Sequence, residues 1–197
     1  MSTPLAFAAH PVSGGALPGR TAHERRWSPA DVVALSVVVV AAYALKRHYS
    51  TASAEDLRWA LAPTTHMVAL FTGAHFTMER GAGFVIESRR LVIAPACAGV
   101  NFLVISLLSL TFTFVTKVRR PSRKAMFVLA SATVAYASMV LVNATRISLV
   151  LFLSPHLRFL GGGSAAQLHR VEGVVTYLAA LWLLTTLGRF LLKAVNR

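Results

Sequence analysis

The chain is poor in acidic residues. Its 197 residues contain 7 Asp and Glu against 20 Lys and Arg, which gives a formal net charge of +13. Charged residues make up only 14% of the sequence, whereas 55% is hydrophobic and the mean hydropathy is +0.61. This composition excludes a soluble globular domain and predicts an integral membrane protein. The basic residues lie mostly between apolar runs, as topology signals facing anionic lipid do, so we expect no nucleic-acid partner.

Cysteine is scarcer still. The single cysteine, Cys97, excludes an intrachain disulfide, and no Cys/His spacing suited to a metal is present. The chain also lacks a His-Glu-x-x-His motif, which argues against an intramembrane metalloprotease. No cleavable signal pattern precedes the first apolar run, which begins near Asp31. We therefore expect neither a metal nor another cofactor, and a chain that keeps its N-terminal segment.

The composition divides the chain into a tail and one domain. Residues 1–28 are rich in proline, glycine, alanine and serine, and they predict a disordered tail. Ser28 and Pro29 then suit a helix start, with the serine as cap and the proline at the first helical position. We expect residues 29–197 to form a single membrane-embedded domain.

Apolar runs predict an all-α membrane protein with about five transmembrane helices, over residues 32–45, 59–78, 97–116, 125–153 and 171–187. The second run is the weakest, because Pro63, His66 and His75 interrupt it. It either spans the membrane or re-enters from one side. A spanning run would place the N-terminus outside, and a non-spanning run would place it inside with the C-terminus.

Composition also predicts the character of two loops. Loop 117–124 has five Lys and Arg and no acid, so it is the strongest cytoplasmic signal in the chain. Residues 154–168 contain a proline and three consecutive glycines, which predicts a flexible outer loop.

The segment 79–95 differs from the apolar runs. Two β-prone triplets, residues 84–86 and 91–93, are separated by four polar residues, and Gly81 and Gly83 flank a preceding turn. This pattern predicts a small β-hairpin outside the bilayer, placed just before the helix that carries Cys97.

Three polar residues stand near one end of long apolar runs: Cys97, Arg146 and His169. Each lies 20 to 22 residues from a basic residue at the far end of its run, namely Lys117, Lys124 and Arg189 respectively. At 1.5 Å per helical residue these gaps are roughly 30 Å, one hydrocarbon thickness. If the three basic residues share one membrane face, then a thiol, a guanidinium and an imidazole share the other. Such a set predicts an active site.

Neighbouring residues support the three candidates. Small residues around Cys97, including Gly99, leave room for another chain, and Asn101 follows one turn later; we expect Cys97 to begin its helix, where the helix dipole favours a thiolate. Asn143 precedes Arg146 by three residues, and Glu172 follows His169 by three, so each pair shares a helix face. Each of the three residues also has a purely structural interpretation. Cys97 would be a buried packing residue, Arg146 would extend (snorkel) to water at the membrane surface, and His169 would be a structural residue at the interface.

Three short stretches together resemble the exosortase/archaeosortase family: ACAGVNF at 96–102, NATR at 143–146 and HRVEG at 169–173. The resemblance extends over about residues 59–187, and the stretch from 61 to 102 looks most like the short exosortase K subgroup. It implies catalytic roles for Cys97, Arg146 and His169, because these positions match the family's motifs. Asn143 matches the Asn that precedes the family's Arg.

The resemblance also implies a reaction. The protein would be a cysteine transpeptidase of the inner (cytoplasmic) membrane, with its active site on the extracytoplasmic side. Its partners would be exported proteins that end in a sorting signal: a short motif, a transmembrane helix and a basic tail. A different class stays open, a non-enzymatic membrane subunit or scaffold in which Cys97 only packs.

The charge pattern yields a prediction about topology. Loop 117–124 and the C-terminus should be cytoplasmic, and Cys97 should face outward. A membrane-impermeant thiol reagent applied to intact cells should therefore label Cys97, the only cysteine in the chain. A Cys97→Ser variant supplies the blank. Labelling that occurs only after the inner face is exposed would contradict the topology.

Overall fold

The computed structural model describes residues 27–86, 91–157 and 165–195, with side chains described for 27–86, 92–152 and 171–190. The order of elements is α1 (Pro29–Tyr49), α2 (Arg58–Thr72), β1 (Thr77–Glu79), β2 (Gly83–Ile86), β3 (Leu91–Ile93), the 3₁₀ turn η2 (Pro95–Cys97), α3 (Val100–Phe114), the 3₁₀ turn η3 (Val115–Lys117), α4 (Pro121–Leu157) and α5 (Ala165–Val195).

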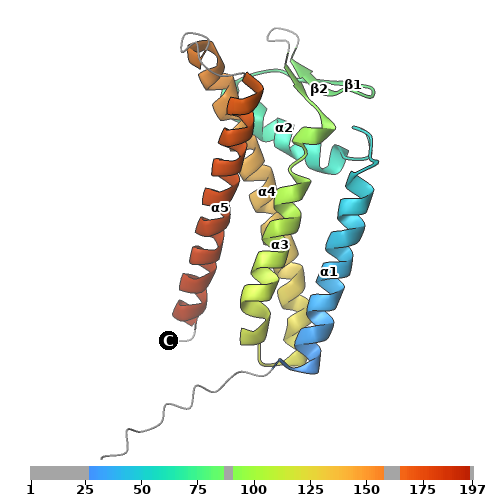
Figure 1. The fold of residues 1–197 in the computed structure, drawn as a ribbon, viewed down its shortest axis with the longest axis vertical. Helices are drawn as coiled ribbons and strands as arrows, with labels where there is room; N and C mark the ends of the chain where they lie inside the picture. Colours follow the sequence, from blue (N-terminus) through green and yellow to red (C-terminus); the bar gives the residue numbers. More distant parts are fainter. Residues whose placement is uncertain (1–26, 87–90, 158–164, 196–197) are drawn as a thin grey trace, which may run out of the picture.

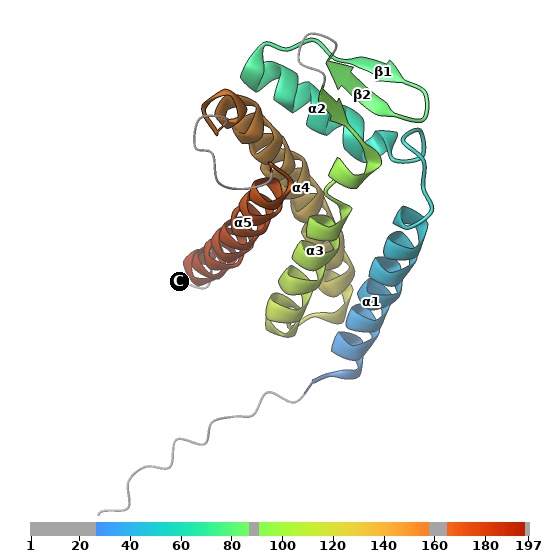
Figure 2. The ribbon, with the colours of Figure 1, turned by 45° about the horizontal axis from the view of Figure 1, so that its top comes forward.

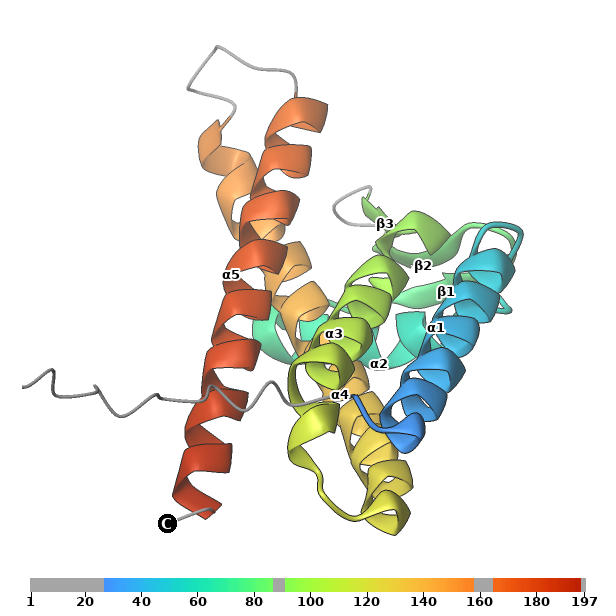
Figure 3. The same ribbon diagram turned by 60° about the horizontal axis from the view of Figure 1, so that its bottom comes forward.

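Four long helices run side by side, and α2 lies across one end of them (Figure 1). Helices α3 and α4 form the central pair, with α1 packed on one side of the pair and α5 on the other (Figure 3). The three-stranded sheet sits beyond α2 at the same end of the bundle (Figure 2). This end also receives the C-terminal part of α4 and the start of α5. The opposite end holds the α3–α4 loop and both the first turn of α1 and the last turn of α5.

Four segments of the described chain are long and apolar enough to cross a membrane: Pro29–Tyr49, Pro95–Lys117, Pro121–Phe152 and Val171–Phe190. Helix α2 has 15 residues, roughly 22 Å, which falls short of a hydrocarbon core of about 30 Å. The all-α membrane fold is thus confirmed, with four candidate spans rather than about five. The sequence left open whether residues 59–78 span; they form α2 and the start of β1 instead.

The number of spans determines which helix ends lie on the same side of the membrane. With α2 outside the set of spans, the start of α1 lies at the same end as the α3–α4 loop and the end of α5 (Figure 1). This is the second of the two arrangements that the sequence allowed, with both ends of the described chain on one side. The surface of the bundle is apolar, as lipid requires: Val174, Leu178 and Trp182 of α5 are all strongly exposed.

The first turn of α1 is tied to α4 by a buried ion pair. Ser28 caps α1 in a reciprocal capping box with Asp31, as the sequence predicted for this start. Lys124 of α4 donates to the Asp31 carboxylate at 2.5 Å and to the Ser28 hydroxyl at 2.9 Å. Both charged side chains are almost completely buried. The cation expected only as a topology signal therefore also joins two helices.

Helix α2 continues through Pro63 because another helix repairs the break. Proline has no N–H, so the carbonyl of Trp59, four residues earlier, loses its partner within the helix. The hydroxyl of Tyr136 on α4 donates to that carbonyl at 2.8 Å, and its ring stacks on Trp59 with centroids 6.0 Å apart. This contact fixes α2 across α4.

The predicted hairpin is confirmed and extended by one strand. Strand β2 pairs with β3 in antiparallel register, with Val85 opposite Val92, and β1 adds to the other edge of β2, with Thr77 opposite Val85. Strand β1 was not predicted, since its first residues stand at the end of an apolar run. Gly83 has a φ of +116°, and a Cβ there would come within 2.3 Å of the Ile93 carbonyl oxygen. Only glycine fits where the backbones of β2 and β3 approach this closely.

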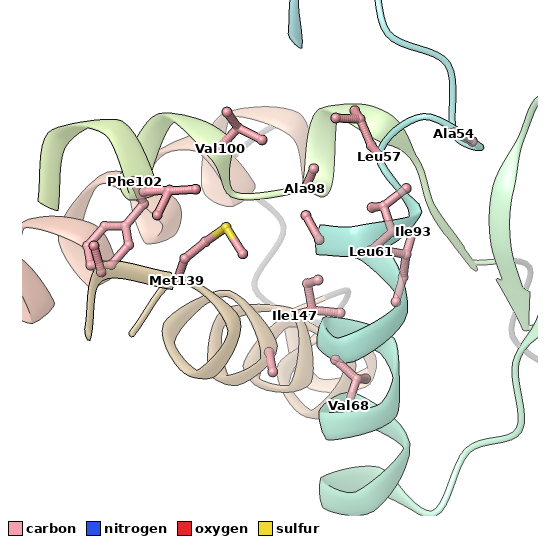
Figure 4. Close-up of a cluster of buried hydrophobic side chains, with 14 of the residues drawn as sticks. Ala54, Leu57, Leu61, Val68, Ile93, Ala98, Val100, Phe102, Met139 and Ile147 are labelled. Atoms are coloured by element: carbon pink, nitrogen blue, oxygen red, sulfur yellow. The ribbon is translucent and has the colours of Figure 1, made fainter. Parts of the chain in front are cut away.

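A compact apolar cluster joins the end elements to the central helices (Figure 4). Leu57 and Leu61 from the start of α2 meet Ile93 of β3 and Ala98, which directly follows η2; all four are fully or almost fully buried. Ile147 of α4 belongs to the same cluster. The turn that carries Cys97 is therefore held between the sheet, α2 and α4.

Other predicted segments fall partly outside the described residues. The tail expected over 1–28 is described only from residue 27, and the hairpin turn 87–90 lies outside the description. The outer loop expected at 154–168 is shorter than predicted, because α4 continues through Pro155 to Leu157 and α5 begins at Ala165. The three glycines lie in 158–164, outside the described chain.

The ion pair between α1 and α4 generates a prediction. Asp31→Ala should lower the free energy of unfolding by about 3–5 kcal/mol, because it leaves the Lys124 ammonium buried without its carboxylate. Unfolding in detergent, followed by circular dichroism, measures the loss. The double variant Asp31→Ala with Lys124→Met removes both charges and should recover most of the stability. A single variant as stable as the parent would show that the pair does not hold the two helices.

Candidate active site

Cys97 lies on a short turn of its own. It ends the 3₁₀ turn η2, and α3 begins only at Val100. The expectation that Cys97 begins the long helix is therefore wrong by three residues. Ala98 and Gly99 separate the two elements, and Gly99 has the left-handed conformation, with a φ of +72°. The thiol is partly exposed. The site is thus a kinked entry into a membrane helix, with the only cysteine just before the kink.

Gly99 serves a second purpose at this kink. A Cβ on Gly99 would lie 3.1 Å from Cγ of Met139 and 3.2 Å from both Cγ and Nδ2 of Asn143. The absence of a side chain lets α4 approach the backbone next to Cys97. The predicted room for another chain is therefore filled within the protein, by α4.

Asn143 links the Cys97 turn to α5. Its side chain is fully buried. Its Nδ2 donates to the backbone carbonyl of Cys97 at 2.5 Å, and its Oδ1 accepts from the hydroxyl of Tyr177 at 3.0 Å. One carboxamide on α4 thus contacts both neighbouring elements.

Arg146 points into the bundle one turn above Asn143. The residue is 8% exposed, and its Nε has no hydrogen-bond partner among the described side chains. Its guanidinium carbon lies 5.4 Å from the centre of the Tyr177 ring. A Cβ on Gly173 of α5 would come within 3.0 Å of Nη1. The snorkelling alternative is contradicted by this burial, and a buried cation inside a membrane bundle is a functional candidate.

His169 is placed only by its helix. It lies in the first turns of α5, and its side chain falls outside the described residues. Gly173 and Tyr177 follow it by four and eight residues, so the three positions share one face of α5. Since Gly173 and Tyr177 both contact Arg146, this face is turned toward the site. The meeting of thiol, guanidinium and imidazole stays a prediction.

The two remaining predicted residues, Glu172 and Asn101, have different surroundings. Glu172 accepts from the Thr176 hydroxyl at 3.3 Å, and its buried Oε2 has no partner among the described side chains. Asn101 is exposed and accepts from Nζ of Lys46 on α1 at 2.6 Å. Asn101 therefore connects α3 to α1, on the opposite side of α3 from the α5 contacts that Asn143 and Arg146 make.

Two tyrosines near the site were not predicted from the sequence. Tyr177 contacts both Asn143 and Arg146. Tyr49, at the end of α1, packs against the same apolar cluster as Cys97. A helical wheel could have singled out Tyr177, because it repeats the four-residue step from His169. No comparable pattern marks Tyr49, which only folding brings to the site.

Comparison with known families agrees with this architecture. The helices form a polytopic membrane protein whose polar site lies at one end of the bundle. Residues 16–186 match the transmembrane exosortase family (Exosortase_EpsH). The match covers most of the chain, so the protein belongs to this family, which indicates a membrane transpeptidase in general terms. No curated protein and no solved structure shows significant similarity to the chain.

The kink at Gly99 generates a prediction with a matched control. Gly81 has nearly the same conformation, with a φ of +76°, but nothing lies within 4 Å of a Cβ placed there. Both alanine variants should lose about 1–2 kcal/mol through the left-handed backbone. Gly99→Ala should lose a further 1–3 kcal/mol, roughly, because the methyl group presses on Asn143. Unfolding of the two variants in detergent measures the difference, and equal losses would show that α4 yields without cost.

Proposed function

We propose that the protein is a membrane-embedded cysteine transpeptidase that cleaves C-terminal sorting signals of exported proteins. The observation that carries the proposal is the buried Arg146 guanidinium, whose Nε has no hydrogen-bond partner among the described side chains. Tyr177 and Asn143 join this guanidinium to the turn that ends in the chain's single cysteine. A nucleophile and a buried cation held by shared contacts suit acyl transfer.

Cys97 acts as the nucleophile. As a thiolate it attacks the scissile carbonyl, and the C–N bond then breaks to leave a thioester on Cys97 and an amine on the removed signal. The partial exposure of Cys97 gives the substrate access. The kink at Gly99 keeps the thiol off the axis of α3, where a peptide can reach it.

Arg146 stabilises negative charge. A guanidinium is a poor base but a strong donor, so it suits the thiolate or the oxyanion of the tetrahedral intermediate. In a site walled by apolar side chains such a donor is worth more than it is in water. Its Nε has no hydrogen-bond partner among the described side chains, so this donor can serve the reaction.

His169 transfers the proton. It protonates the leaving amine and later takes a proton from the acceptor that attacks the thioester. The acceptor is an amine in transpeptidation, or water in hydrolysis. The position of His169 on the face of α5 that contacts Arg146 supports this role.

The substrates we propose match the geometry. A sorting signal with a transmembrane helix and a basic tail would lie beside the bundle, with its cleavage motif at the end that carries Cys97. That end lies opposite the basic α3–α4 loop (Figure 1), so we place the site on the extracytoplasmic side of the inner membrane. The rival interpretation, a non-enzymatic subunit, leaves the buried Arg146 guanidinium without a purpose, although a charge inside a membrane bundle is costly.

Substitutions at the three catalytic residues test the proposal. Cys97→Ala should abolish processing without unfolding the protein, since only the nucleophile is lost. Arg146→Lys should also be severely impaired, because lysine keeps the charge but not the planar set of donors. His169→Ala should slow processing by roughly 10²–10⁴-fold. The measurement is the mass shift of a co-expressed exported protein that carries such a signal, with the membrane level of each variant determined in parallel.

Two exposed histidines provide matched controls. His66→Ala and His75→Ala remove imidazoles from positions that the structure leaves exposed, and both should process at the parent rate. Near-normal processing by Cys97→Ala at normal protein level would falsify the transpeptidase and return Cys97 to a packing role.

A further inference from the structure

Tyr177 of α5 lies where α3, α4 and α5 meet. Its hydroxyl contacts Asn143 of α4, one face of its ring is near Arg146 of α4, and its ring also lies 5.1 Å from that of Phe102 on α3. We propose that Tyr177 is a positioning residue that sets the Cys97 turn against the Arg146 guanidinium. This inference rests on the proposed function and extends it to a residue outside the predicted triad.

The hydrogen bonds have only one possible direction. The Cys97 carbonyl can only accept, so the Asn143 carboxamide must present Nδ2 to it. The Oδ1 of Asn143 then faces Tyr177, whose hydroxyl must donate. Loss of this donor leaves the buried Oδ1 of Asn143 without its partner and removes one of the two hydrogen bonds that fix the carboxamide. The phenol therefore holds the Cys97 turn through Asn143.

The ring of Tyr177 positions the second partner. Cations are attracted to the face of an aromatic ring, and the Arg146 carbon at 5.4 Å is within that range. Gly173, one turn before Tyr177, leaves the space that the guanidinium fills. Phe102 is almost fully buried and supports the ring from α3. One side chain thus fixes both the thiol turn and the cation.

Tyr177 also helps to set the rotation of α5. Among the described side chains of this helix, Val175, Leu178 and Trp182 are strongly exposed, whereas Leu181 and Leu184 pack against the core. Apolar surface facing lipid does not fix the rotation of a helix. The hydrogen bond and ring contacts of Tyr177 add a directional constraint to this packing, and they help to set the face of α5 on which His169 lies.

The test uses the single cysteine of the full-length protein in detergent. Iodoacetate and iodoacetamide alkylate the same thiolate, so the ratio of their rates cancels the thiolate fraction and reports positive charge near Cys97. The parent should favour iodoacetate, and Arg146→Gln should set the floor of the ratio. Tyr177→Phe should lower the parent ratio about fivefold toward that floor, because the turn is no longer held beside the guanidinium.

A matched control separates positioning from general stability. Tyr136→Phe also removes a hydroxyl that donates to a carbonyl at a helix contact, but it should leave the ratio unchanged. In an Asn143→Ala background, Tyr177→Phe should cause no further fall, since its hydroxyl acts through Asn143. If Tyr177→Phe does not reach the membrane, Asn143→Ala alone must give the same fall in the ratio.

Three outcomes would overturn the inference. The first is a parent ratio no higher than that of Arg146→Gln. The second is a ratio in Tyr177→Phe equal to that of the parent. The third is that Tyr177→Phe lowers the ratio in the Asn143→Ala background by as much as it does in the parent. The alkylation needs no substrate, so it is independent of the transpeptidase proposal. If Cys97→Ala still processes the signal while Tyr177→Phe lowers the ratio, the function has failed and the positioning role stands.

Discussion

The fully buried carboxamide of Asn143 is the interaction on which the arrangement of the site depends. It joins the turn before α3 to α4 and α4 to α5, and both of its polar atoms are used. A buried amide without partners costs several kcal/mol, roughly 2–7 depending on the reference state. Both hydrogen bonds are kept only when the three elements meet in this geometry.

Glycine makes this meeting possible at two places. Gly99 lets α4 reach the backbone beside Cys97, and Gly173 lets the Arg146 guanidinium lie against α5. At the other end of the bundle the buried pair of Asp31 and Lys124 fixes α1 on α4. These two ends of the bundle have different roles: the Asp31–Lys124 pair orders helix ends, and Asn143 with Arg146 holds groups of the site. Between them the helices contact each other mainly through apolar side chains.

Much of the fold could be predicted because local signals agree with the final structure. Ser28 and Pro29 begin α1, and the two β-prone triplets pair as β2 and β3. Two local placements depend on contacts between helices. The sequence left open whether residues 59–78 span; they form α2, in which the Trp59 carbonyl freed by Pro63 accepts from Tyr136 of α4. Cys97 looked like a helix start, but the left-handed Gly99 ends its turn because Met139 and Asn143 press against that position.

By itself, the sequence determined the membrane class and the family, and it predicted that Cys97 and Arg146 lie at the same end of their helices, because hydropathy and helical rise along one chain are enough for these inferences. Only the tertiary structure decided that Arg146 turns inward rather than to water, and that Tyr177 contacts both Arg146 and Asn143. The physical reason is that these placements depend on contacts between helices distant in sequence. A hydrophobic run specifies that a helix crosses the bilayer. The rotation of that helix depends on its contacts with neighbouring helices, including the buried polar groups that pair inside the bundle.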